Sequence, residues 1–120
     1  MEDSKTLKLI EEVIAKTEAG RIWWESSASE DSYFSVLPSG HTIIVAKKRE
    51  YDGYAWYSFV LRDANRQQLL EVSWGPDGEG LVLVKDVYEL AEQRALEEET
   101  RALKELDANL DKVLGELARL

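Results

Sequence analysis

The sequence contains no cysteine, one histidine and two prolines among its 120 residues. Without cysteine the chain cannot build a disulfide scaffold, a zinc ribbon, an iron–sulfur cluster or a thiol nucleophile. One histidine is too few for an imidazole metal cage. No apolar run approaches the roughly 20 residues that a membrane-spanning helix requires. These absences predict a cytoplasmic protein that uses no cofactor and does not enter a membrane.

The charge is strongly negative. The chain has 24 acidic and 15 basic residues, which gives a formal net charge of −9 at pH 7. Nucleic acids and anionic membranes are bound by neutralising their phosphates with Lys and Arg, so neither is an expected partner. A length of 120 residues suits one hydrophobic core. We therefore expect a single domain over residues 1–120.

The first 20 residues have helical spacing. Leu7, Ile10, Val13 and Ile14 recur at three- and four-residue intervals, which places one apolar stripe on a helix. Gly20 follows the last apolar position and suits the left-handed conformation that ends many helices. We expect a helix over residues 1–20.

Residues 21–75 change to the alternating period of strands. Five short runs rich in β-branched and aromatic residues are expected to be strands: Ile22–Trp24, Tyr33–Leu37, Thr42–Ala46, Ala55–Leu61 and Gln68–Trp74. The turns between them are too short for parallel crossovers, so neighbouring strands must be antiparallel. Turn signals are Gly40, Asp52-Gly53 and Asn65 in the left-handed region. The pattern predicts a meander in strand order 1-2-3-4-5, covered by helices on one face.

Helical spacing returns in residues 82–120. This region has no proline and a single glycine, Gly115, so most of it can be one helix. Leu81-Val82-Leu83 could instead form a sixth strand, although the helix start is favoured. The fold class expected is thus α+β, with an N-terminal helix, a five- or six-stranded antiparallel meander and a long or bent C-terminal helix.

The C-terminal region carries apolar residues at heptad spacing. From residue 96 to residue 120 a helix would span about 37 Å, longer than one face of a small sheet can cover. Such a stripe must be buried on a second copy, on another protein, or on this chain's own body through a turn near Glu99-Thr100. Self-association is favoured. The residues expected to carry it are Leu96, Leu103, Leu106, Leu110, Val113 and Leu117.

A search for catalytic groups finds little. His41 follows a turn and has no thiol to activate, and the G-x-S-x-G and phosphate-binding glycine motifs are absent. His41 is therefore interpreted as a solvated turn residue. Paired carboxylates carry no weight because acidic residues are frequent throughout the chain. We expect no enzymatic activity.

Aromatic residues gather on the expected strands. Alternation sends Trp23 and Trp24 to opposite faces. Tyr51, Tyr54 and Trp56 form a candidate patch for a protein partner beside the basic Lys47–Arg49. Lysines near a strand end more often prevent edge-to-edge aggregation than bind nucleic acid.

The order of these elements resembles a loose group of small, uncharacterised bacterial proteins. The resemblance rests on the opening helix, the segment from Gly20 to Trp24, the meander, the Val87–Ala91 segment and the final Leu110–Leu114 helix. It implies an α+β fold and a bacterial origin, and it implies no activity, cofactor or site residue.

The function expected is a non-enzymatic protein–protein interaction module that forms a homodimer through its C-terminal helix. An alternative is an acidic inhibitor, antitoxin or immunity-type protein that occupies a basic partner. Its binding would weaken steeply with salt, whereas an apolar dimer would be nearly indifferent to salt. A third hypothesis, a small-molecule cup lined by tryptophans, predicts ligand-dependent fluorescence.

Overall fold

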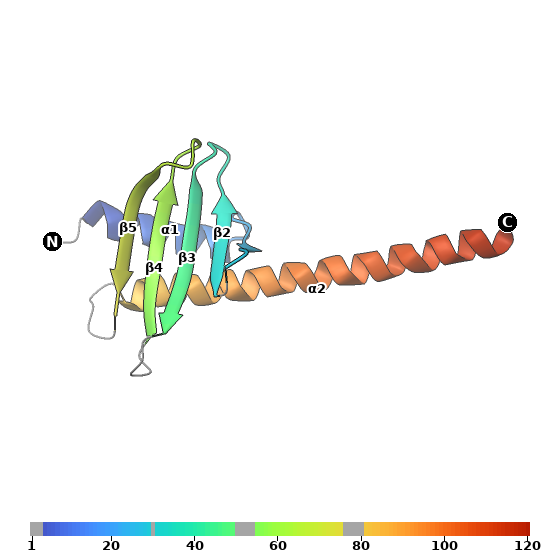
Figure 1. Ribbon diagram of the computed structural model, residues 1–120. Helices are drawn as coiled ribbons and strands as arrows, with labels where there is room; N and C mark the ends of the chain where they lie inside the picture. Colours follow the sequence, from blue (N-terminus) through green and yellow to red (C-terminus); the bar gives the residue numbers. More distant parts are fainter. Residues whose placement is uncertain (1–3, 30, 50–54, 76–80) are drawn as a thin grey trace.

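The structure is a computed structural model that describes residues 4–29, 31–49, 55–75 and 81–120. Within these ranges it has an N-terminal helix, a five-stranded antiparallel sheet and a long C-terminal helix, which confirms the predicted α+β fold. The elements in chain order are α1 (Ser4–Glu18), β1 (Glu25–Ser26), β2 (Ser32–Val36), β3 (Thr42–Arg49), β4 (Ala55–Arg62), β5 (Gln68–Trp74) and α2 (Leu81–Arg119). Both helices cross the same face of the sheet (Figure 1).

Helix α1 forms where its apolar spacing predicts. Ile10, Val13 and Thr17 are buried and lie on one side of the helix, toward the core. Gly20 has a φ of 73°, and its amide donates to the Thr17 carbonyl at 3.0 Å. The left-handed glycine therefore ends the helix and turns the chain toward the sheet.

The sheet is the predicted meander, with strand order β1-β2-β3-β4-β5 and antiparallel neighbours throughout. Tyr33 lies opposite Val45, and Val45 lies opposite Phe59. Val45 and Phe59 are fully buried in the same cluster as residues of both helices. This row therefore belongs to the face that the helices cover.

The turns between strands match the prediction in one place and depart from it in another. Gly40 has a φ of 91°, and a Cβ added there would lie 2.9 Å from the Cβ of Ala64. In the β4–β5 turn the left-handed residue is Arg66, with a φ of 65°, rather than the expected Asn65. The expected turn at Asp52-Gly53 lies outside the described residues.

The prediction of a first strand at Ile22–Trp24 was wrong. Strand β1 comprises Glu25–Ser26 instead, directly after the two tryptophans. The reason is Trp24, which is 2% exposed and whose indole Nε1 donates to Thr17 Oγ1 at 3.0 Å. Thr17 Oγ1 in turn donates to the Val13 carbonyl at 2.7 Å. Because Trp24 anchors this segment against α1, strand pairing begins only after it.

Helix α2 runs without interruption over 39 residues. At about 1.5 Å per residue its axis is about 58 Å long. The alternatives of a sixth strand at Leu81–Leu83 and of a turn near Glu99-Thr100 are therefore wrong. Apart from Gly115 the helix contains no residue that disfavours a helix strongly, and one glycine costs only about 1 kcal/mol.

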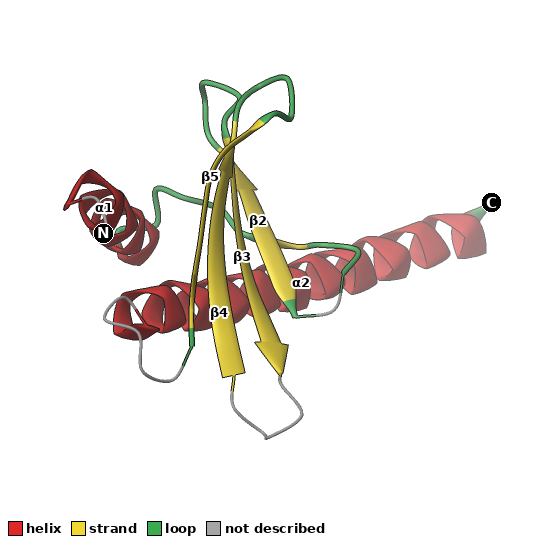
Figure 2. Ribbon diagram, turned by 60° about the vertical axis from the view of Figure 1, so that its left-hand side comes forward, coloured by secondary structure: helices red, strands yellow, loops and turns green. Residues whose placement is uncertain are grey.

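Only the first part of α2 belongs to the core. Its buried apolar residues all precede residue 96: Val84, Val87, Tyr88, Ala91 and Ala95. Beyond them the helix leaves the body past the β1–β2 edge of the sheet and projects away from it (Figures 1 and 2). The radius of gyration is 18.1 Å, against about 14 Å for a compact chain of this length. The protein is thus a small body with a rod attached.

Candidate interaction surface

The exposed part of α2, from residue 96 onward, is called the distal helix below. The six residues predicted for self-association lie there with exposed fractions between 50% and 66%, and we call them the seam: Leu96, Leu103, Leu106, Leu110, Val113 and Leu117. Their three-, four- and seven-residue intervals align them along one side of the helix. Leu114, 63% exposed, widens this stripe. The structure brings the predicted residues together and leaves them accessible to solvent.

Glu99 interrupts the seam between Leu96 and Leu103. Its Oε1 accepts a hydrogen bond from Ser26 Oγ at 2.8 Å, so the break falls where α2 passes β1. An apolar residue there would leave the Ser26 hydroxyl without this partner. The uninterrupted part of the seam therefore starts at Leu103, beyond the body.

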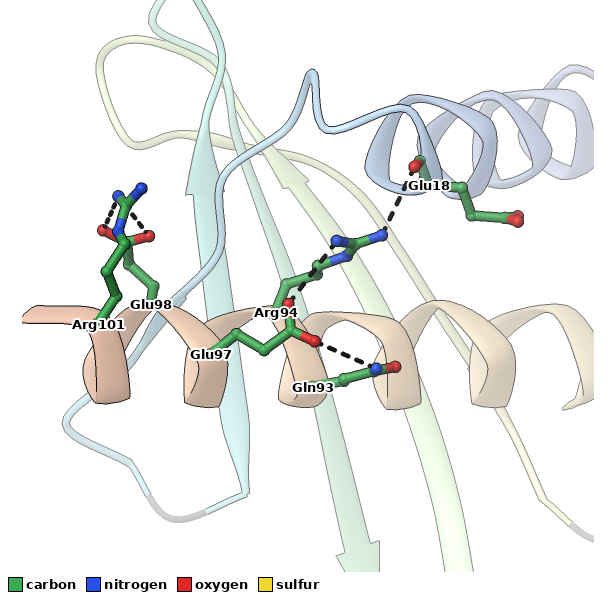
Figure 3. A network of polar contacts seen from close by, with 6 residues as sticks. All are labelled: Glu18, Gln93, Arg94, Glu97, Glu98 and Arg101. Carbon is green, nitrogen blue, oxygen red and sulfur yellow. Dashed lines mark hydrogen bonds and ion pairs between the residues drawn. The ribbon is translucent and has the colours of Figure 1, made fainter.

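A group of polar side chains lies on α2 beside the end of α1, and Arg94 connects the two helices (Figure 3). Arg94 Nη2 donates to the Glu18 carbonyl at 3.5 Å, and Nη1 lies 3.7 Å from Glu97 Oε2. Gln93 Nε2 donates to Glu97 Oε1 at 3.2 Å. Within the described residues, Arg94 Nε is buried without a hydrogen-bond partner. These long contacts orient the two helices but contribute little to stability.

Trp23 lies on the surface beside this group. It is 63% exposed, whereas Trp24 is buried, so the two neighbours differ in exposure although neither lies on a strand. The guanidinium of Arg101 lies 5.7 Å from the centroid of the Trp23 ring. Arg101 Nη2 also donates to both carboxylate oxygens of Glu98, at 2.7 and 2.8 Å, and this contact raises the pKa of Arg101. The exposed Trp23 ring therefore has a cation–π contact with Arg101 on the surface.

A hollow of about 250 Å³ lies between Trp23, Arg94 and Arg101. Its lining also includes Glu97 and Glu98, whose carboxylates already contact the two arginines. The four charges sum to zero, so the hollow offers no net charge to select a ligand. We assign it no binding role.

Three tyrosines, from β2, β4 and α2, meet in the space between the sheet and α2. The ring of Tyr88 lies 5.6 Å from that of Tyr33 and 5.5 Å from that of Tyr57, in tilted geometry. The Tyr88 hydroxyl donates to Glu92 Oε2 at 3.4 Å. Burial, followed by the charge of Glu92, raises the pKa of both Tyr88 and Tyr33. These phenols are neutral packing groups and are poor acid–base catalysts near neutral pH.

The predicted aromatic patch is described only at Trp56, because Tyr51 and Tyr54 lie outside the described residues. Trp56 is 39% exposed, and its ring packs so closely on Gly75 that an added Cβ would lie 2.6 Å away. Lys47 Nζ lies 5.9 Å from the centroid of the Tyr57 ring. The patch as a whole stays a prediction.

Other chemistry is sparse in the part of the chain that the structure describes. His41 Nδ1 lies 2.8 Å from Ser39 Oγ within the β2–β3 turn, a local contact between neighbours. No group of three or more His, Asp or Glu side chains within the described ranges is placed to hold a metal ion. The described helices include none with both the length and the apolar character needed to cross a bilayer.

Comparison with protein-family models, with curated proteins and with solved structures returns no significant match to this chain.

Proposed function

We propose that the protein is a non-enzymatic interaction module that forms a homodimer by pairing the distal helices of two copies. The observation that carries this proposal is the seam, six aliphatic side chains that are at least half exposed along one side of a rod. Full burial of such a side chain contributes about 1.5–3 kcal/mol. Each half-exposed residue therefore has roughly 1 kcal/mol still to gain from a partner.

A second copy is the occupant that the seam fits best. Apolar residues at alternating three- and four-residue spacing form the knobs and holes of a coiled coil, and an identical helix supplies the complementary pattern. The distal helix contacts no sheet along most of its length, and a lone helix of this size is marginal in water. Pairing therefore stabilises both the seam and the helix that carries it.

The position of Glu99 favours antiparallel pairing. In a parallel pair each residue faces its own counterpart, so two Glu99 carboxylates would meet inside the interface, which is unfavourable. In an antiparallel pair centred between Leu106 and Leu110, Leu106 faces the partner's Leu110, and Glu99 faces the partner's Leu117. This arrangement keeps the two acids about 27 Å apart along the axis, because 18 residues rise about 1.5 Å each.

Cysteine cross-linking tests both the pairing and its direction. The natural chain has no cysteine, so each single variant reports on one position. Asp107→Cys flanks the seam near the centre of the antiparallel pair and should form an intermolecular disulfide readily under mild oxidation. Leu103→Cys should not, because its counterpart then lies about 15 Å away along the axis, beyond the Cα separation of about 7 Å that a disulfide tolerates.

Two controls complete the cross-linking experiment. A variant with the exposed Lys8→Cys on α1, far from the seam in sequence, measures the rate of random collision. Preferential cross-linking of Leu103→Cys would show a parallel dimer. Rates equal to that of Lys8→Cys for both Asp107→Cys and Leu103→Cys would reject pairing through the distal helix.

A further inference from the structure

The face of the sheet opposite the helices carries apolar side chains at its centre, between Glu25 on β1 and Glu71 on β5. Phe34 lies opposite Ile44, and Ile44 lies opposite Val60, so the three form a row across β2, β3 and β4. Val36, at the end of β2, is 60% exposed. An uncovered face of an antiparallel sheet usually carries polar side chains. No described helix covers this row, so its composition calls for a partner.

A groove of about 610 Å³ lies over this face and is open to solvent. Phe34, Val36 and Ile44 are among the residues that line it, together with the serine-rich segment after β1 and the turn after β4. A volume of this size falls within the range of about 300–1,000 Å³ for ligand sites in proteins. The groove has room for a short stretch of another chain.

One rim of the groove is positively charged. Arg62 and Arg66 both line it, and neither forms an ion pair within the described residues. Asp63 lines the same rim, where its Oδ1 accepts the amides of Asn65 and Gln67, each at 2.9 Å, so the two arginines and this carboxylate leave the rim with a net charge of +1. In a chain of net charge −9, a rim with a net positive charge is a local exception.

The turn between β4 and β5 fixes the backbone of this rim. Arg66 has a φ of 65°, a conformation in which glycine or asparagine is normally found, and Asn65 stands one residue earlier. The Arg66 amide donates to the Asp63 carbonyl at 3.0 Å, so a hydrogen bond of the turn fixes the Arg66 backbone. A left-handed residue at this place is common in short hairpin loops that end in a bulge, so the turn geometry accounts for it.

We propose that this groove binds an acidic segment of a partner protein that carries apolar side chains between its carboxylates. Arginine suits this role because its planar fork can hold a carboxylate through two hydrogen bonds. The carboxylates of the segment contact Arg62 and Arg66, and its apolar side chains pack on Phe34, Val36 and Ile44. This site lies on the face opposite α2 and does not depend on pairing of the distal helices.

Fluorescence anisotropy with defined peptides tests the proposal on the full chain. The probe is a labelled eight-residue peptide that alternates glutamate and leucine. We expect it to bind at micromolar concentration, at least tenfold more tightly than peptides alternating lysine with leucine or glutamate with serine. A third peptide, covering residues 103–117 of this chain, tests whether the groove instead takes the distal helix of a second copy.

Charge reversal identifies the site. Arg62→Glu with Arg66→Glu should weaken binding of the glutamate–leucine peptide at least tenfold, and Val36→Ser should weaken it about threefold. Lys16→Glu with Arg21→Glu makes the same change in net charge at exposed positions outside the groove and should alter binding less than twofold. Circular dichroism of each variant verifies that the fold is retained.

Three results would overturn the proposal. One is a glutamate–leucine peptide that fails to bind below 1 mM, and another is binding that the Arg62 and Arg66 reversal leaves unchanged. The third is tighter binding of the 103–117 peptide than of the probe, which would make a second copy the occupant. Loss of binding only in the groove variants would support the site.

Discussion

The two halves of α2 have similar apolar spacing but opposite surroundings. In the first half Val87 and Ala91 are 0% exposed, because the sheet and α1 pack against them. In the distal helix Leu103 is 66% exposed and Leu110 is 52% exposed. The comparison teaches that the spacing of apolar residues predicts a stripe that needs burial, whereas the length of the helix relative to the body determines what can bury it.

Replacing a valine by aspartate in each half of α2 should give the largest difference in the free energy of unfolding. Val87→Asp places a charge in the closed core and should cost about 4 kcal/mol or more, enough to unfold most of the protein. Val113→Asp, at a residue that is 50% exposed, should change the free energy of unfolding of the body by less than about 0.5 kcal/mol.

Urea denaturation followed by near-UV circular dichroism measures both values, because the tryptophans report on the body. Val113→Asp should instead raise the dimer dissociation constant at least tenfold, since each interface then buries two unpaired carboxylates. Equal destabilisation of the body by both variants would mean that the distal helix is part of the folding core.

The adjacent tryptophans extend the comparison to the segment between α1 and β1. Trp24→Ala should cost about 3–5 kcal/mol, because it leaves a large cavity and removes the hydrogen bond to Thr17. Trp23→Ala removes an exposed ring and should cost less than about 1 kcal/mol. Thermal unfolding of the two variants provides the test, and a similar loss in both would contradict the assigned burial.

Replacing Glu99 by an apolar residue should have a smaller effect, and it should strengthen the dimer. Glu99→Leu removes the only acid in the predicted stripe and should tighten the dimer about tenfold, the equivalent of 1.4 kcal/mol of added apolar burial. Glu99→Gln, which keeps the hydrogen bond with Ser26 feasible, should tighten it less. A dimer weakened by Glu99→Leu would show that the contact with Ser26 matters more than continuity of the seam.

Alkaline pH should destabilise the body through Tyr88. The pKa of Tyr88 is raised in the folded protein above the value of about 10 for an exposed tyrosine. Above pH 10 the unfolded chain releases this proton while the folded chain retains it, so the free energy of unfolding falls as pH rises. Below pH 10 the contribution is fully present.

Tyr88→Phe isolates this contribution. Denaturation midpoints at pH 9 and pH 11 should differ less in the variant than in the natural chain. An unchanged pH dependence would show that other groups cause the alkaline loss.

Much of the fold could be predicted from the sequence because local signals were strong. The helical spacing of the apolar residues from Leu7 to Ile14 predicts α1. The short turns exclude parallel crossovers and so predict an antiparallel meander. The strand at Ile22–Trp24 was misplaced because β propensity cannot show that Trp24 has a hydrogen-bond partner on α1. The contact between Trp24 and α1 therefore outweighs the β propensity of this segment.

The candidate sites were predictable to different degrees. Heptad spacing located the seam, since every member lies on one helix and no tertiary information is needed. The groove was missed because Arg62 and Phe34 are brought together only by strand pairing. A usable signal was present: Tyr33-Phe34 and Ile43-Ile44-Val45 are consecutive apolar residues, which indicate a sheet with apolar side chains on both faces.

The mass of the protein in solution tests the central claim most directly. In sedimentation equilibrium from 1 to 200 µM, the weight-average mass should rise toward twice the 13.7 kDa of one chain. The apolar seam predicts that raising NaCl from 50 to 500 mM does not reverse this rise. A mass of 13.7 kDa at every concentration would contradict the account, because the seam would then remain exposed without a second copy.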